Sequence, residues 1–462
     1  MAIYKTPGVY IEEISTLPAS VAAVETAIPA FVGYTAEAEK DGVNVTGKAI
    51  RISSLLEYRE IFGGPNNEGI DVVLNDTVNS ANEVTNRSVV VTIPSVSKFK
   101  LYYQLQMFFN NGGGDCYILS VGDYSTGVSQ SELTDGVKLL ETVDEPTLLL
   151  FPDAVSLDTV GEYGQVIQAS LDHCNKLQDR FTIADMYGSD ATVFRGQLGT
   201  DYLKYGAAYY PFLETTLNYG FDESVVDITA HNQSGGGAVT SLAGTTLATL
   251  ASTEPSLYRT ILAEIAKKRV VLSPCGSVAG IYARVDRDRG VWKAPANVGV
   301  RSVVGPVTKI THEQQESLNV DASTGKSINA IRVFTGKGTL VWGARTLAGN
   351  DNEWRYVPVR RLYIFIEESV KKATEFVVFE PNDANTWLRT KTMIENFLTT
   401  LWRVGALAGA KTNEAFFVKV GLGETMTAQD ILEGRMIIEI GMAAVRPAEF
   451  IILKFSHKMQ ES

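Results

Sequence analysis

The sequence contains no long uninterrupted apolar segment and no excess of basic residues. None of its apolar runs approaches the roughly 20 residues that a membrane-spanning helix requires, and its start lacks the basic and then apolar layout of a signal peptide. The formal net charge of −12 argues against a general electrostatic attraction to nucleic acid or to anionic lipid. These absences predict a protein that folds in the cytoplasm and binds neither nucleic acid nor membrane directly.

Cysteine and histidine are scarce, at three and four residues in a chain of 462. Their scattered positions give no metal-ligand spacing, and an odd number of cysteines in apolar settings favours buried, reduced thiols over disulfides. Cys275 with His312, or Cys174 with the adjacent His173, could be drawn as a nucleophile and its base. Neither pair has a recognisable nucleophile turn, and adjacent side chains diverge on a helix. The sequence therefore predicts no catalytic, cofactor or metal site.

No internal repeat with a fixed period is visible, so any periodic structure must come from many chains. A chain of this length exceeds the usual limit for one hydrophobic core, and two or three domains are expected. Short apolar runs predict strands, and the stretches between them have helical periodicity. The strands are expected at 116–121, 147–151, 180–185, 207–210 and 270–272, and the helices at 160–178 and 255–269. This alternation predicts an α/β class with a mainly parallel sheet covered on both faces.

Composition and pattern divide the chain into consecutive segments. We expect an extended N-terminal arm at 1–20, part of the inner core at 21–65, a surface insertion at 66–98, an α/β core at 99–215, an outer surface insertion at 216–254, core and junction at 255–347, a C-terminal α+β domain at 348–448, and a C-terminal strand and arm at 449–462. Both ends are predicted to be strands without a neighbour in sequence. Such strands must dock on their own domain or pair with another chain.

The segment from Ser273 to Val298 surrounds a short apolar run with turn formers, small residues and alternating charges. Its acidic residues could suggest a catalytic carboxylate pair, but the neighbouring arginines would keep both acids ionised. A salt-bridged junction between the α/β core and the C-terminal domain is the favoured interpretation. Its predicted residues are Arg284, Asp286, Arg287 and Trp292.

The tripeptide Gly325-Lys326-Ser327 resembles the end of a phosphate-binding loop. The first glycine of that motif would fall at Val320, and the residues at 328–334 are strand-like and not helical. Both structural requirements of the motif therefore fail. A polar approach to a hairpin is the favoured interpretation.

Three stretches of the sequence together resemble one family. The run AGIYARVDRDRGVWKAPAN at 279–297, the run LVWGARTL at 340–347 and the start YKTPGVYIEE at 4–13 closely resemble the sheath proteins of contractile phage tails and related contractile injection systems. The resemblance implies a structural subunit and not an enzyme. It implies stacked hexameric rings that form a helical sleeve around an inner tube, and a contraction that drives the tube through a target membrane.

The resemblance also implies partners and site residues. The partners are further copies of the chain, an inner tube protein, and baseplate and terminal cap proteins, with sister sheath proteins left open. The chain ends would exchange between neighbouring subunits and complete a sheet in the C-terminal domain. The matching residues are Tyr4, Val9, Tyr10, Ile11, Phe450, Ile452 and Phe455. The particle would be a phage tail or a released extracellular device, assembled in the bacterial cytoplasm and requiring no cofactor.

A helix predicted over 383–404 carries a partly basic stripe on an otherwise acidic protein. Contact with an inner tube should be weak and polar so that the sheath can let go. Arg389, Lys391 and Arg403 are the candidates for facing the tube. Two alternatives stay open: an α/β enzyme, either nucleotide-dependent or a cysteine hydrolase, and a shell or surface-layer protein.

Overall fold

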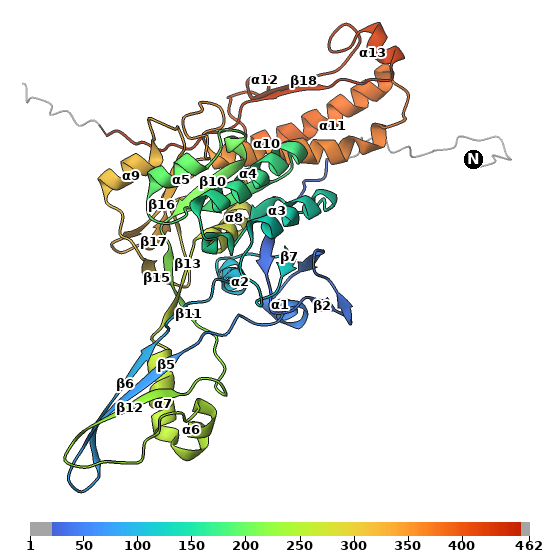
Figure 1. The fold of residues 1–462 in the computed structure, drawn as a ribbon. Coiled ribbons are helices and arrows are strands. Elements are labelled where there is room, and N and C mark those ends of the chain that lie inside the picture. The colour runs from blue at the N-terminus through green and yellow to red at the C-terminus, as the bar shows by residue number, and fades with distance from the viewer. Residues whose placement is uncertain (1–20, 454–462) are drawn as a thin grey trace, which may run out of the picture. The chain divides into compact units, whose positions relative to one another are not determined.

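The computed structural model describes residues 21–453, and the chain divides into two compact units (Figure 1). Of the described residues, the larger unit contains 25–364 and 446–453, and the smaller unit contains 21–24 and 365–445. The division falls inside helix α10 (Val357–Thr374). Each unit is considered by itself below.

The main sheet of the larger unit has nine strands. From one edge to the other they are β14 (Val298–Gly299), β17 (Gly338–Val341), β16 (Ile328–Phe334), β10 (Gly206–Tyr210), β9 (Phe181–Asp185), β8 (Leu148–Leu150), β1 (Pro29–Tyr34), β7 (Cys116–Gly122) and β4 (Ala49–Ile52). The strands from β16 to β7 run parallel, whereas β17, β14 and β4 pair antiparallel at the edges. The predicted α/β class with a mainly parallel sheet is confirmed.

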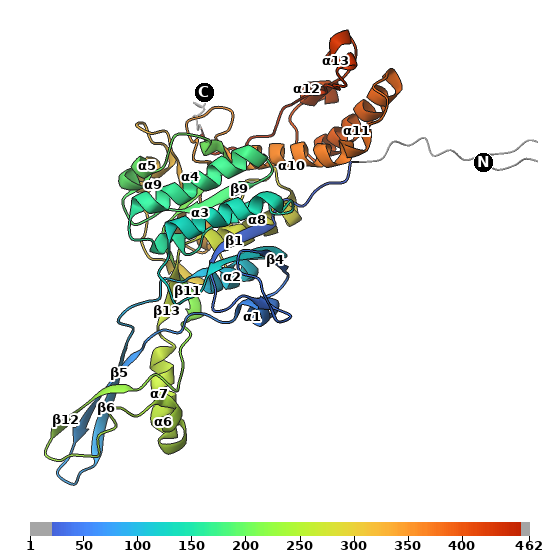
Figure 2. The ribbon, with the colours of Figure 1, turned by 45° about the vertical axis from the view of Figure 1, so that its right-hand side comes forward.

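Helices cover both faces of this sheet (Figure 2). Phe31 of β1 makes an edge-to-face contact with Phe108 of α2 (Leu101–Asn110), with ring centroids 5.5 Å apart. The next residue, Val32, lies against Gly136 of α3 (Gln130–Leu139). Because successive strand residues point to opposite faces, α2 and α3 lie on opposite sides. Helix α8 (Cys275–Arg289) packs beside α2, and α4 (Val160–Leu177) packs beside α3. Shorter helices complete the unit: α1 (Leu55–Phe62), α5 (Ala191–Gln197) and α9 (His312–Asn319).

Small residues let α8 approach α2 closely. A Cβ atom on Gly276 would lie 2.3 Å from the carbonyl oxygen of Gln104, and one on Gly280 would lie 2.4 Å from that of Phe108. Both distances are far below van der Waals contact, so only glycine fits. The small residues of the 273–298 segment therefore have a packing role.

The two predicted surface insertions form one module. Strands β5 (Asp71–Val78) and β6 (Val84–Thr92) pair as a hairpin, and β12 (Ile228–Gly235) pairs parallel to β5. Helices α6 (Leu247–Thr253) and α7 (Pro255–Ile265) complete the module, which has its own hydrophobic core (Figure 2). Strand β13 (Arg269–Leu272) forms as predicted but lies in a separate antiparallel sheet with β11 (Leu213–Asn218) and β15 (Val303–Pro306).

The smaller unit contains helices and one short sheet. Its elements after α10 are α11 (Ala384–Arg403), α12 (Thr412–Ala415), β18 (Phe416–Lys419), α13 (Ala428–Leu432) and β19 (Glu439–Met442). β18 and β19 pair antiparallel, and α11 packs on β18. The long period-3.6 pattern over 383–404 predicts α11 almost to the residue.

Asp153 connects three parts of the larger unit. Its carboxylate accepts the backbone N–H of Tyr34 at 2.8 Å, of Lys100 at 2.5 Å and of Leu101 at 3.1 Å. Strand β1 and the start of α2 are therefore held to the segment after β8. A Cβ on Gly33 would lie 2.4 Å from this carboxylate, so the contact requires glycine there. Burial raises the pKa of Asp153 to about 6 in spite of the three donors.

Substitution Asp153→Ala should lower the free energy of unfolding by roughly 2–4 kcal/mol, because buried N–H groups lose their acceptor. Urea denaturation followed by circular dichroism measures the change. The control is Asp158→Ala, which removes an exposed carboxylate paired with Lys98 and should leave the free energy of unfolding essentially unchanged. Equal costs for the two variants would contradict the assigned role of Asp153.

Candidate functional site

A buried ion pair joins the start of the described chain to α8 and α10. Arg361 donates from Nη1 to Asp286 Oδ1 at 3.0 Å and from Nη2 to Asp286 Oδ2 at 2.5 Å. Thr26 donates its hydroxyl to the same carboxylate at 2.6 Å, and its carbonyl oxygen accepts from Arg361 Nη2 at 2.8 Å. Side-chain exposure is 3% for Arg361 and 6% for Asp286. The N-terminal end of the larger unit is therefore fixed to both helices at one point.

An aromatic pair supports the Arg361 guanidinium. It lies 4.5 Å from the centre of the Tyr282 ring, and the Tyr282 hydroxyl contacts that of Tyr209 at 2.6 Å. Burial raises the pKa of both phenols, so they remain neutral. Removing one partner of such a buried pair leaves the other charge uncompensated. The sequence points to Asp286 but gives no signal for Arg361, whose partner is 75 residues away.

The other predicted junction residues contact different groups. Arg284 is buried and donates to the carbonyl oxygen of Gly299 at 2.6 Å. Arg287 is exposed and donates to the Gly112 carbonyl oxygen at 3.2 Å, whereas Trp292 is half-buried. Arg284 and Arg287 belong to α8 itself and Trp292 follows it, but their contacts are not with Arg361. Their junction role stays a prediction.

The C-terminal end of the larger unit also has an arginine–carboxylate contact. Arg345 donates to Glu449 from Nε at 2.9 Å and from Nη2 at 2.6 Å. Asn319 Nδ2 donates at 2.8 Å and the Tyr356 hydroxyl at 3.1 Å. Burial alone would raise the pKa of Glu449, but these donors outweigh it and hold the pKa below its usual value. The carboxylate is therefore ionised at neutral pH.

An exposed apolar segment follows Glu449. The exposed fractions are 70% for Phe450, 79% for Ile451, 79% for Ile452 and 72% for Leu453. A cavity of about 450 Å³ lies beside the segment, lined in part by Trp342 and Tyr356. Residues 449–453 form no strand in the single chain, where no neighbouring strand pairs with them, so the predicted C-terminal strand stays a prediction. Phe455, Tyr4, Val9, Tyr10 and Ile11 lie outside the described residues.

The β18–β19 sheet has two ladder strands among residues 21–453. Each strand forms a ladder only with the other, and directly after β19 the backbone at 443–445 bonds to Ala406 and Ala408. The outer edges of β18 and β19 themselves carry no further ladder in these residues. Phe417 of β18 is 44% exposed. Open, partly apolar edges of this kind recruit strands from elsewhere.

The basic candidates on α11 separate into two groups. Successive helix residues are about 100° apart, so Arg389 and Arg403 project from the same side and Lys391 from roughly the opposite side. Arg389 and Arg403 are exposed, and Lys391 is half-buried. The Arg389 guanidinium lies 5.8 Å from the ring centre of Phe376. A single basic surface can therefore include Arg389 and Arg403 but not Lys391.

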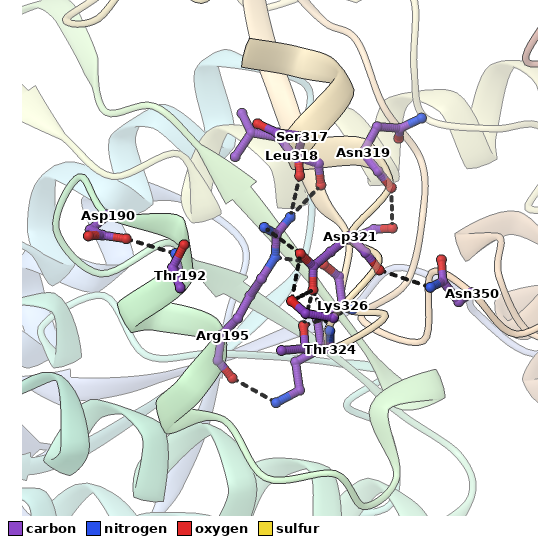
Figure 3. A network of polar contacts seen from close by, with 12 residues as sticks. Asp190, Thr192, Arg195, Ser317, Leu318, Asn319, Asp321, Thr324, Lys326 and Asn350 are labelled. Atoms are coloured by element: carbon purple, nitrogen blue, oxygen red, sulfur yellow. Dashed lines mark hydrogen bonds and ion pairs between the residues drawn. The ribbon is translucent and has the colours of Figure 1, made fainter. Parts of the chain in front are cut away.

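Lys326, from the phosphate-loop-like tripeptide, has a structural role (Figure 3). Its ammonium donates to the carbonyl oxygens of Arg195 at 2.7 Å and Leu198 at 2.6 Å, just at the end of α5. The Arg195 guanidinium in turn donates to the carbonyl oxygens of Lys326, Ser317 and Leu318. Burial lowers the pKa of both cations. The two side chains cross-link α5 to the end of α9 and to the loop after it, and two of the three donors of the Lys326 ammonium are used by backbone carbonyl oxygens.

The candidate catalytic pairs do not come together. Cys275 is buried, whereas the His312 side chain is 87% exposed. His173 lies against Arg180, and Cys174 contacts the Thr182 hydroxyl at 3.4 Å. All three cysteines are buried and unpaired, which confirms that prediction.

The described part of the chain contains neither a metal-binding cluster nor a membrane-spanning helix. Within residues 21–453, no cluster of His, Cys, Asp and Glu side chains is arranged to hold a metal ion. None of the helices in that range combines the length and apolar character needed to cross a bilayer. Among the described residues, the exposed apolar segment 450–453 and the edges of the β18–β19 sheet are the features that favour contact with other chains.

Family comparison identifies the kind of assembly. The model of the phage tail sheath protein central domain matches residues 212–347, and that of the phage tail sheath C-terminal domain matches 349–458. The chain is 23% identical over 181 residues to the tail sheath protein of Vibrio phage KVP40, an alignment that covers 39% of this chain. It covers only 26% of that longer relative. The chain belongs to the phage tail sheath family, whose members are structural proteins and not enzymes.

Solved structures match over the full length. The helical sheath of the anti-feeding prophage in its contracted state is 33% identical, with a TM-score of 0.66, and the match covers 99% of this chain and 100% of that one. The PVC sheath complex of an extracellular contractile injection system, also contracted, is 31% identical with a TM-score of 0.65. That match covers 99% of each chain. The family expected from the three sequence runs is confirmed.

Substitution Lys326→Met should lower the free energy of unfolding by about 2–3 kcal/mol, because two buried carbonyl oxygens lose their charged donor. Adding Mg-ATP should leave the melting temperature of the unchanged protein and of the variant unaltered. The control is Lys337→Met at an exposed hairpin turn, with an expected cost below about 0.5 kcal/mol. A melting temperature that rises with nucleotide and loses this rise in Lys326→Met would contradict the structural role.

Proposed function

We propose that the chain polymerises as stacked six-membered rings into a sleeve around an inner tube and that contraction of the sleeve drives the tube through a target membrane. The observation that carries this proposal is the exposed apolar segment 450–453 in a chain whose β18–β19 sheet has open edges. A soluble chain that exposes such a segment needs a partner to cover it. Family membership makes another sheath subunit the natural partner.

The two ends of the chain are proposed to act as exchanged arms. Residues 4–13 of one subunit and 450–455 of another would add to the β18–β19 sheet of a third. Main-chain hydrogen bonds between strands give affinity without demanding a rigid angle between the units they connect. Heterologous contacts of this kind do not close on themselves and so generate a helical assembly.

The proposed partners follow from the architecture of such a sleeve. They are further copies of this chain, an inner tube protein, a baseplate and a terminal cap, and sister sheath proteins are a further candidate. Similar chains occur in a structure of the anti-feeding prophage baseplate and in contracted sheaths, which supports self-assembly and association with a baseplate. We propose assembly in the bacterial cytoplasm and a final place in a phage tail or an extracellular particle.

The exposed side of α11 is the proposed surface for the tube. Arg389 and Arg403 project from this side, and the polar residues Asn396 and Thr400 lie between them. Exposed charges give a contact that is specific, weak and sensitive to salt. A sheath that must slide along or leave the tube needs a contact of this kind.

Deletion of residues 1–14 should leave a folded, soluble chain that forms no sleeves, because the donated strand is missing while the core is untouched. Circular dichroism and the melting temperature test folding, and negative-stain electron microscopy of purified protein tests assembly. Sleeves of normal length from the deleted chain would contradict arm exchange.

The double variant Arg389→Glu/Arg403→Glu should retain its fold and lose assembly on the tube, because its charge on the proposed surface is reversed. Co-sedimentation of sheath with purified tube protein at low salt measures the loss, expected at about tenfold or more. Lys411→Glu, at an exposed position of the smaller unit, is the matched control and should sediment normally. Normal sedimentation of the double variant would exclude this surface.

A further inference from the structure

The segment leading to the C-terminal arm is attached to the core at one side chain. Within the described residues from Arg446 to Leu453, the hydrogen bonds to the rest of the larger unit all end on the Glu449 carboxylate. Arg446 and Ala448 are exposed, and the residues from Phe450 onward are exposed and apolar. Apolar burial therefore contributes little to holding this segment in place.

The receptor for Glu449 is rigid. Arg345 and Tyr356 are joined by a backbone bridge, and the neighbouring Thr346 N–H donates to the Arg355 carbonyl oxygen at 2.9 Å. Arg345 is 4% exposed and also donates to the Asn319 carbonyl oxygen at 3.2 Å. A planar guanidinium held in this way offers a fixed two-pronged site for one carboxylate.

Within residues 21–453, no other side chain holds this segment by hydrogen bonds. The cavity of about 450 Å³ runs along the residues from Pro447 to Ile451, so the surface beneath them is hollow. His312 and Glu316, which also line it, are 87% and 69% exposed at their side chains. Loss of the Glu449 contact would leave the segment free to lift away from the core.

We propose that Glu449 is a positioning residue that anchors the root of the C-terminal arm, so that tension on the arm enters the core through Arg345, Asn319 and Tyr356. This inference rests on the proposed arm exchange. An arm can transmit tension between subunits only if the residues at its start stay bound to their own core. A carboxylate that accepts five hydrogen bonds from three side chains provides a defined end point for that tension.

The test uses Glu449→Gln in the full-length chain, which keeps the shape of the side chain and removes its charge. Chymotrypsin cleavage after Phe450 requires the residues before it to enter the protease in extended form, so Glu449 must first leave its site. Cleavage of the isolated subunit should accelerate about tenfold, because proteolysis follows the population of the released state. Mass spectrometry of the new C-terminus at Phe450 measures the rate, because the released peptide is itself cut after Leu453 and Phe455.

The same variant is then compared in assembly and in stability. The amount of protein in sedimented sleeves should fall at least about threefold. The melting temperature of the isolated subunit should fall by no more than about 4 °C, because Arg345 keeps the carbonyl oxygens of Asn319 and Gly349 as acceptors. The matched control is Glu145→Gln, which removes an exposed carboxylate partner of Arg51 and should change none of the three readouts. Arg345→Lys, which keeps the charge but loses the two-pronged contact, should give intermediate cleavage and assembly.

Three results for Glu449→Gln would overturn the inference. They are cleavage at the original rate, normal sleeves in spite of faster cleavage, or a drop in melting temperature large enough to explain the loss of assembly by unfolding. The last result would mean that Glu449 stabilises the core as a whole. Failure of the unchanged protein to form sleeves would instead overturn the proposed arm exchange, and the cleavage rates would still decide whether Glu449 holds the segment.

Discussion

The ion pair between Arg361 and Asp286 is the contact on which the architecture depends. It fixes the first residues of the larger unit, through Thr26, to the helix α8 and to the start of α10. Helix α8 in turn fits against α2 only because Gly276 and Gly280 carry no side chains. The 273–298 segment is therefore held in place by the Asp286–Arg361 ion pair and by the close packing of α8 against α2.

A second buried arginine, Arg345, binds the carboxylate of Glu449 near the C-terminal end of the described part of the larger unit. Near each end of the larger unit a buried guanidinium thus holds a carboxylate. Buried ion pairs add little net stability but are costly to break on one side only. They suit a subunit whose ends must stay fixed while the rest of its surface exchanges partners.

Much of the fold could be predicted from the sequence, because long periodic patterns determine α4 and α11, and short apolar runs determine β7, β8 and β9. Helix α3 was missed because its apolar face is interrupted by Gly136, whose smallness matters only where Val32 and Val121 approach it. The union of β5 with β12 joins residues about 150 positions apart, which no local pattern reveals. Arg361 and Glu449 were missed for the same reason, since their partners are distant in sequence.

The central claim is that sheath subunits are joined by their chain ends. A cryo-electron microscopy map of sleeves assembled from the purified protein tests it most directly. The account predicts that residues 4–13 and 450–455 continue the β18–β19 sheet of neighbouring subunits, with Glu449 still bound to Arg345 of its own chain. Chain ends folded back on their own subunit, in sleeves of normal length, would contradict it.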